Sequence, residues 1–258
     1  MRVRASFDTV DGANNATHGV EFSNLSIRGA GSPCDPYALC ANTPGSFTCT
    51  CIAPYAGDGT QACNVLGTQS QPAANCKAIY DLNGTLADGF YWLKWTAAPA
   101  TQVWCDNAGW TRVVQDDFNA SPGSWLPKTL TTCGTSGLLG GTGVAGKGYA
   151  ISDSLGGLPS HTQMRIQGTV QCIDAWFSNT VTLQTDGLQV WTATVTNPIA
   201  STFNPDSCGN AAIADLKQNI NVTFTHSSVS ALLQFATTLT AGPSVAAYGI
   251  DDINVWVK

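Results

Sequence analysis

The sequence contains little charge, and this scarcity excludes several classes of protein. Charged residues make up 11% of the 258, with eleven Lys and Arg against seventeen Asp and Glu, for a formal net charge of −6. Nucleic acids and anionic membranes both attract clustered Lys and Arg, so neither is an expected partner. No run of residues is long and apolar enough to span a bilayer, so we do not expect membrane insertion.

The sequence also lacks the motifs of common enzymes. It contains no Gly-x-Ser-x-Gly elbow, no His-Glu-x-x-His pair and no phosphate-binding glycine loop ahead of a helix. The three histidines, His18, His161 and His226, are far apart along the chain. Acid pairs for glycoside hydrolysis could in principle come from four aspartates at loops or strand ends, where Asp usually serves a turn: Asp153, Asp174, Asp186 and Asp206. We therefore do not expect an enzyme.

Cysteines, in contrast, are plentiful. Ten of them in a chain without metal-ligand spacing indicate an oxidising compartment. Five Asn-x-Ser/Thr sequons indicate the same, and they predict N-linked glycans at Asn15, Asn24, Asn83, Asn119 and Asn221. No signal peptide is visible at the start. We expect a secreted or cell-surface protein whose leader was removed, or a piece of a longer chain.

A weak internal repeat links the two ends of the chain. Residues 18–27 resemble residues 248–257, and the matching positions pair Gly19, Glu21 and Asn24 with Gly249, Asp251 and Asn254. One explanation is that two alternating strands look alike. The other is that residues 1–28 form the closing hairpin of a second copy of the C-terminal domain. A hairpin alone is marginal in water and exposes unpaired edges, so it would complete a preceding domain or a neighbouring subunit.

The spacing of residues 34–63 is distinctive: Cys34, Cys40, Cys49 and Cys51, then Tyr55-Ala-Gly-Asp-Gly and Cys63. It resembles an EGF-like module, in which bridges replace a core that so few residues cannot form. The resemblance implies the bridges Cys34–Cys49 and Cys51–Cys63. The first cysteine of the family is missing, which leaves Cys40 without its partner. The acidic calcium-binding cluster is missing too, so the module is interpreted as a spacer.

Residues 75–115 are rich in aromatics. Asn75-Cys-Lys-Ala-Ile, Asp88-Gly-Phe-Tyr-Trp-Leu and Gln102-Val-Trp-Cys105-Asp look like the opening of a fibrinogen C-terminal domain. That resemblance implies a Cys76–Cys105 bridge across a small antiparallel sheet and extends no further, so no lectin function follows from it. The aromatic residues could form a sugar-stacking face, although alternating aromatics on strands are more often core: Phe90, Tyr91, Trp92, Trp95 and Trp104.

From residue 116 onwards, short alternating runs are bounded by turn residues and predict a two-sheet sandwich. The expected strands are 164–170, 181–184, 190–195, 220–225, 231–236 and 253–257, and residues 134–148 are expected to be a flexible glycine-rich loop. The two ends of this region, Gln115-Asp-Asp-Phe118 and Tyr248-Gly-Ile-Asp-Asp-Ile, resemble those of MAM-like and carbohydrate-binding-module-like jelly rolls, as in surface and filament glycoproteins of ciliates and algae.

That resemblance implies that the first and last strands lie side by side and hold a structural Ca²⁺ at four matching acids: Asp116, Asp117, Asp251 and Asp252. Carboxylates gathered together repel, and a divalent cation would relieve the repulsion. The alternative is that two of them point to solvent and the others cap turns. Among the remaining cysteines, Cys133 and Cys208 both lie in expected loops and we pair them, while Cys40 and Cys172 have no local partner.

Together these features predict an all-β protein: a disulfide-rich EGF-like module, an antiparallel β-sandwich of the jelly-roll type, and an N-terminal hairpin that completes a neighbouring copy. The expected segments are 1–33 (closing hairpin and linker), 34–63 (EGF-like), 64–75 (linker), 76–115 (fibrinogen-like fragment) and 116–258 (jelly roll). The function we predict is a structural repeating subunit of an extracellular glycoprotein filament or coat, whose partners are further copies of itself. The alternative is a cell-surface adhesin that binds carbohydrate.

Overall fold

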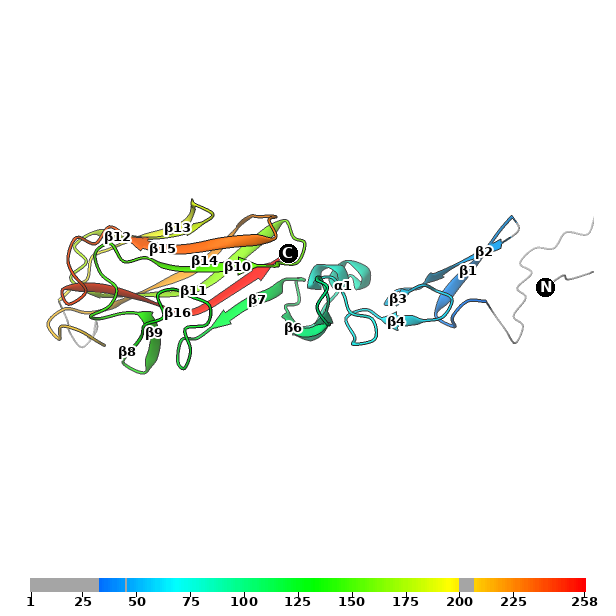
Figure 1. Ribbon diagram of the computed structural model, residues 1–258, viewed down its shortest axis with the longest axis horizontal. Coiled ribbons are helices and arrows are strands. Elements are labelled where there is room, and N and C mark those ends of the chain that lie inside the picture. The colour runs from blue at the N-terminus through cyan, green and yellow to red at the C-terminus, as the bar shows by residue number, and fades with distance from the viewer. Residues whose placement is uncertain (1–32, 45, 200–206) are drawn as a thin grey trace, which may run out of the picture.

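The computed structural model of the protein describes residues 33–44, 46–199 and 207–258. These residues form an elongated molecule with three parts in a row (Figure 1). The EGF-like module lies at one end, a small central domain follows, and a β-sandwich occupies the other end. The predicted hairpin 1–28, with Asn15 and Asn24, lies outside the described residues. Its pairing with another copy therefore stays a prediction.

The EGF-like module consists of two short hairpins. Strand β1 pairs with β2, and β3 pairs with β4, all antiparallel; their bounds are Ala38–Thr43, Ser46–Cys51, Tyr55–Gly57 and Cys63–Val65. The bridges are Cys34–Cys49 and Cys51–Cys63. The large apolar side chains here are mostly exposed, from 39% at Ile52 to 67% at Leu39. The two disulfides, rather than a core, therefore hold this module together.

The central domain combines one helix with one hairpin. Helix α1 (Cys76–Asn83) starts where the Asn75 side chain accepts the Ala78 N–H at 2.8 Å, and it ends at Gly84, whose φ of 72° gives a left-handed C-cap. Strands β5 (Gly89–Leu93) and β6 (Thr101–Cys105) form the hairpin. The disulfide Cys76–Cys105 joins the helix to β6 beside buried Ile79. The helix is a feature that the sequence analysis did not predict.

The β-sandwich has one large and one small sheet. The large sheet has the order β14–β11–β16–β7, continues into β6 and β5, and takes β9, with β8 beside it, at the other end of β16. The small sheet has the order β10–β15–β12–β13. The large-sheet strands not yet given are Thr111–Asp116 (β7), Leu130–Cys133 (β8), Ser136–Gly140 (β9), Gln163–Asp174 (β11), Leu216–Thr225 (β14) and Ala246–Val257 (β16). The small-sheet strands are Ile151–Gly156 (β10), Asn179–Thr185 (β12), Leu188–Val195 (β13) and Ser230–Thr237 (β15).

All six expected strands lie within observed ones, because their alternating apolar side chains point into the space between the two sheets. The expected loop 134–148 is partly wrong, since it contains β9. Gly137 belongs to this strand, and a β-carbon there would lie 2.4 Å from the Phe118 carbonyl oxygen. Close backbone approach, rather than flexibility, therefore explains a glycine at that position.

The core lies between the two sheets and is built around large aromatics. The largest fully buried side chains include Trp125, Trp176, Tyr248 and Phe235. Their polar atoms have partners: the Trp176 indole N–H donates to the Ala247 carbonyl at 2.9 Å, and the Tyr248 hydroxyl donates to the Tyr149 carbonyl at 2.9 Å. Burial raises the pKa of Tyr248. These contacts fix the orientation of the rings in the core.

The central domain joins the sandwich without a linker. Strand β7 pairs with β6 at Thr111 and with β16 along most of its length, so it belongs to both parts. Figure 1 shows it running from the central domain into the sandwich. The expected boundary between residues 115 and 116 falls inside this strand. The ends of the C-terminal domain do lie side by side, with Asp116 opposite Ile253.

Candidate functional site

A cleft of about 320 Å³ lies where the central domain meets the sandwich. One wall comes from Arg112 to Val114 of β7, and the other from the end of β10 and the turn after it. Trp95 and Val103 of the central domain and Ser124 complete the lining. The cleft therefore lies between the edges of the two sheets, and three separate parts of the chain contribute to it.

The strand edges that line the cleft carry free backbone groups. In the residues that the structure describes, β7 pairs with β6 only at Thr111, and β10 has only the bridge Leu126–Ser152 on the edge away from β15. Beyond these points each edge presents N–H and C=O groups without a strand partner. Such groups can bond to a hydroxyl-rich ligand or to water.

Trp95 is held in place by contacts at both ends of its side chain. Its indole N–H donates to the Gly157 carbonyl at 2.6 Å, across the junction between the central domain and the sandwich. Its ring packs against the small core around Ile79 and Leu93. Of the five aromatics considered for sugar stacking, Trp95 is the one that lines the cleft. Phe90, by contrast, is 60% exposed on β5 and does not line it.

A row of tryptophans and arginines covers the outer face of the large sheet beside the cleft. The Arg112 guanidinium lies 5.3 Å from the Trp104 ring centre and 5.5 Å from that of Trp256. The Arg165 guanidinium lies 4.8 Å from the Trp256 ring centre and 4.6 Å from the Trp110 ring centre. These are cation–π distances. They order two long side chains that would otherwise be mobile.

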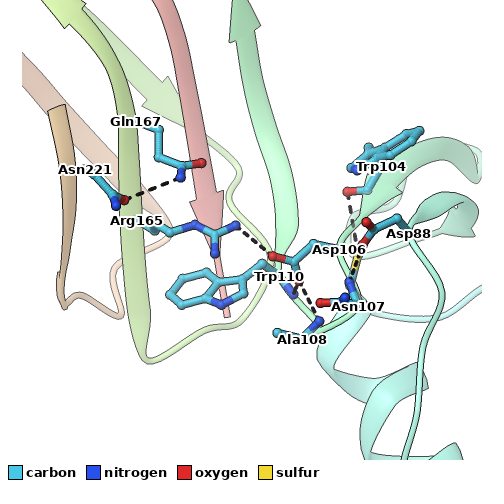
Figure 2. Close-up of polar contacts among 10 residues, drawn as sticks. Asp88, Trp104, Asp106, Asn107, Ala108, Trp110, Arg165, Gln167 and Asn221 are labelled. Carbon is cyan, nitrogen blue, oxygen red and sulfur yellow. Dashed lines mark hydrogen bonds and ion pairs between the residues drawn. The ribbon is translucent and has the colours of Figure 1, made fainter. Parts of the chain in front are cut away.

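Arg165 also forms an ion pair that ties the two domains together. Its Nη2 donates to Oδ2 of Asp106 at 2.8 Å, as Figure 2 shows, and the exposed fractions of the two side chains are 19% and 18%. The other oxygen of Asp106 accepts the backbone N–H groups of Ala108 and Trp110 at 3.0 and 2.9 Å. One carboxylate therefore fixes the turn before β7 and holds it against β11.

One half-buried and one buried carboxyl group lie close to the cleft. Asp116 accepts the Trp125 indole N–H at 2.7 Å, and burial raises its pKa, with the charges of Asp153 and Asp117 adding to the effect. Asp153 is 2% exposed, and burial raises its pKa as well. The Ser124 hydroxyl and the Ser154 N–H face Asp153 and partly offset this rise in its pKa. Neither group has hydrogen-bond geometry with the Asp153 oxygens. Both Asp153 oxygens are thus buried without an accepted hydrogen bond.

The structure only partly assembles the four acids of the expected calcium site. Asp117 is near enough to influence both Asp116 and Asp251 electrostatically. Burial raises the pKa of Asp251 and nearby Asp252 raises it further, whereas Lys217 lowers it. Among the described residues, no three of the four carboxylates have oxygens within 4.8 Å of one another. A calcium ion there stays a prediction, and it would need these side chains to move.

The remaining cysteines form one bridge and leave two thiols. Cys133 is bonded to Cys208, and the Asp215 carboxylate lies beside both sulfurs. Cys40 is free and exposed, and its sulfur lies within 4.8 Å of those of Cys34 and Cys49. Cys172 is free and buried, and burial together with the charge of Asp215 raises its pKa. Cys172 is therefore packed as a core residue.

The sequons within the described residues differ in accessibility. Asn221 and Asn119 are exposed, and Asn83 at the end of α1 is half-buried. The Asn221 side chain accepts a weak bond from Gln167 at 3.4 Å on the outer face of the large sheet (Figure 2). The Asn119 side chain accepts the Gly137 N–H at 3.0 Å. Glycosylation at all five sites stays a prediction.

Two of the three histidines, although 65 residues apart in sequence, are in contact. His161 Nε2 lies 2.7 Å from His226 Nδ1, and His226 Nε2 lies 3.1 Å from the Asp186 carboxylate. Since His161 Nδ1 must donate to the Pro159 carbonyl at 2.6 Å, Nε2 of the neutral His161 ring is left as the acceptor of a proton on His226 Nδ1. Burial lowers the pKa of His161. No sequence pattern indicated this contact, which reaches the cleft through Pro159, a residue of its lining.

Comparison with known proteins gives one family match and several distant structural likenesses. The EGF domain model matches residues 30–63. The sandwich is similar to a CBM36 domain of a multidomain xylanase from the hindgut metagenome of Trinervitermes trinervoides, with 10% identity, a TM-score of 0.31, and coverage of 55% of this chain and 94% of that one. It is also similar to the C-terminal CBM6 of LamC from Zobellia galactanivorans, with 13% identity, a TM-score of 0.30, and coverage of 56% and 98%.

A third similar structure is the C-terminal domain of EclA, described as a sugar-binding protein, with 15% identity, a TM-score of 0.28, and coverage of 43% of this chain and 67% of that one. The EGF match and the disulfides indicate an extracellular protein. Within the described residues no helix could cross a membrane.

Proposed function

We propose that the protein is an extracellular carbohydrate-binding protein of the cell-surface adhesin kind, and that the cleft between the central domain and the sandwich is its glycan site. The observation that carries this proposal is the composition of the cleft. It combines an oriented indole, a guanidinium, two serine hydroxyls and two open strand edges in one hollow. Sugars present apolar C–H faces and many hydroxyls, so a site for them needs both an aromatic ring and polar groups.

The size and openness of the cleft support the same class of ligand. Its volume of about 320 Å³ is at the lower end of the range for small-molecule sites. Apolar contact comes from Trp95, Val103 and Leu158, while Ser124 and Ser154, both exposed residues, add hydroxyl-bearing side chains to the lining. A purely apolar ligand would leave these hydroxyls and the free backbone groups without partners. A glycan can bond to them.

The proposal makes the protein a binder without turnover. The EGF-like module would act as a spacer that holds the sandwich away from the surface. Its two bridges close loops with sequence separations of 15 and 12 residues, each worth roughly 3 kcal/mol. Figure 1 shows the module as a narrow extension at the opposite end from the sandwich.

A glycan array followed by titration of the best ligand tests the proposal. Trp95→Ala should weaken binding about 10-fold or more, because a desolvated aromatic contact is lost. Since Trp95 also packs against a core, Ser154→Tyr provides a second variant that fills the cleft and removes no buried contact; it should block binding. Phe90→Ala is the matched control, since this exposed ring lies outside the cleft.

Two results would contradict the proposal. One is an array on which the natural protein binds no glycan. The other is a bound glycan whose affinity is unchanged in Trp95→Ala and Ser154→Tyr, which would place the site elsewhere on the molecule.

A further inference from the structure

Two arginines share one tryptophan but differ in their polar partners. Arg112 and Arg165 both lie over Trp256, at 5.5 and 4.8 Å from its ring centre. Arg165 has a carboxylate of its own, that of Asp106 at 2.8 Å (Figure 2). Arg112 has no ion pair or hydrogen bond to any side chain or carbonyl in the part of the chain that the structure describes. It is nevertheless half-buried, and burial lowers its pKa.

Aromatic rings leave the hydrogen-bonding needs of a guanidinium unmet. Trp104 and Trp256 attract its charge, but the five N–H donors lie in the plane of the group and need acceptors. Oriented donors of this kind match a carboxylate or a sulfate ester, which can accept two parallel bonds. The two rings hold the guanidinium in advance, so little side-chain entropy remains to be lost on binding.

The cleft also has the charge pattern of an anion site. Arg112 is the only ionisable residue among those that line it, in a protein whose formal net charge is −6. The carboxyl groups of Asp116 and Asp153 do not line the cleft. Both Asp153 oxygens are closed off from solvent. The residues that line the cleft therefore carry one positive charge and no negative one.

We propose that the cleft selects glycans that carry an anionic group, a uronate carboxylate or a sulfate ester, and that Arg112 forms a bidentate pair with it. This inference rests on the proposed function, because it identifies the ligand of the same cleft. Trp95 would stack on a sugar ring while Arg112 pairs with the substituent. Arg112 thereby becomes the specificity-determining residue of the site.

The probes are matched oligosaccharides in calorimetric titrations of the full chain. Trigalacturonate and its carboxyl-reduced form, the neutral galactose trimer, differ only in their carboxylates, and a sulfated galactose trimer represents the second source of charge. One charge-assisted bond is worth about 10- to 100-fold in affinity, so at least one acidic trimer should bind that much more tightly than the neutral one. The preference should shrink as salt rises.

Variants at Arg112 separate its charge from its shape. Arg112→Gln should abolish the preference for acidic trimers, and Arg112→Lys should retain part of it, since lysine keeps the charge but loses the planar fork. Lys147→Gln is the control, because it removes one positive charge from an exposed loop position that does not line the cleft. It should change neither the affinity for the acidic trimers nor that for the neutral trimer. Near-ultraviolet circular dichroism checks that the tryptophan row stays ordered in each variant.

The outcomes distinguish this inference from the proposed function. The anionic selectivity is overturned if neutral and acidic trimers bind with equal affinity and Arg112→Gln does not change that affinity. If Ser154→Tyr still blocks this binding, the glycan site stays in place. Acidic binding that survives Ser154→Tyr places the site outside the cleft and overturns both. The selectivity is also overturned if the acidic trimers do not bind at millimolar concentration.

Discussion

Replacing Asp106 by asparagine removes one negative charge at the junction between the central domain and the sandwich. Asparagine can still accept the Ala108 and Trp110 N–H groups through its remaining carbonyl oxygen, so the turn before β7 keeps its bonds. The partner that changes is Arg165, whose side chain is 19% exposed. The variant leaves a largely buried guanidinium without its carboxylate.

The expected cost follows from that burial. A hydrogen bond to a charged group contributes about 1.5–3 kcal/mol, and screening by water is weak because about four-fifths of both side chains is covered. We expect Asp106→Asn to lower the free energy of unfolding by about 2 kcal/mol. Asp106→Ala also removes the two turn bonds and should cost about 3–4 kcal/mol, at about 1 kcal/mol for each neutral bond.

Urea unfolding followed by tryptophan fluorescence measures these differences, because Trp110 and Trp256 surround the pair. The control is Asp81→Asn. It breaks the exposed ion pair with Lys77 on α1, where the side chains are 43% and 54% exposed, and it should cost no more than about 0.5 kcal/mol. A double-mutant cycle with Arg165→Met isolates the pair itself. If Asp106→Asn costs no more than Asp81→Asn, or the coupling is below about 0.5 kcal/mol, the junction does not depend on this ion pair.

Two further predictions concern the buried acids. Asp153→Asn should raise the free energy of unfolding at pH 7 by about 1 kcal/mol or more, because it removes a charge that is buried without an accepted hydrogen bond. Since burial raises the pKa of Asp153, the folded protein holds this proton more tightly than the unfolded chain, and stability is lost as pH rises through the folded pKa. The gain should therefore vanish as pH falls below the unfolded value near 4; a gain that is equal at pH 3 and pH 7 contradicts this account. Calcium at a hundred times its dissociation constant should stabilise the fold by about 2.7 kcal/mol if the four acids bind it, and Asp251→Asn should remove that effect. An unchanged melting temperature on addition of millimolar calcium would refute the predicted site.

The strands were predictable where alternation is strong and both flanks carry turn residues. In Ala231–Ala236 and Ile253–Val257 a buried apolar side chain recurs at every second position, because each strand has one face in the core. Helix α1 was not predicted, although its capping residues Asn75 and Gly84 are visible in the sequence. It has only eight residues, and the disulfide and the packing of Ile79 stabilise it where intrinsic propensity would not.

The candidate site was not predictable as a site. Trp95 was visible as one of several aromatics, but nothing in the sequence separates it from Phe90, which lies exposed on the same hairpin. The difference between them comes from the Gly157 carbonyl, more than sixty residues away, which accepts the Trp95 indole N–H. The contrast between Arg112 and Arg165 likewise depends on the position of Asp106, which only the folded chain defines. Long-range contacts of this kind leave no local periodicity.

The cleft and the junction have one physical origin. Because β7 passes from the central domain into the sandwich without a linker, the orientation of the two parts is set by the ladder between β7 and β16 and by the Asp106–Arg165 pair. Trp95 on one side and Ser154 on the other are therefore held at a fixed separation. In a site between domains that are joined by a flexible linker, each binding event would cost conformational entropy, because the ligand would have to order the two domains. Here folding has already fixed both walls of the cleft. The residues that stabilise the junction thus also preorganise the cleft.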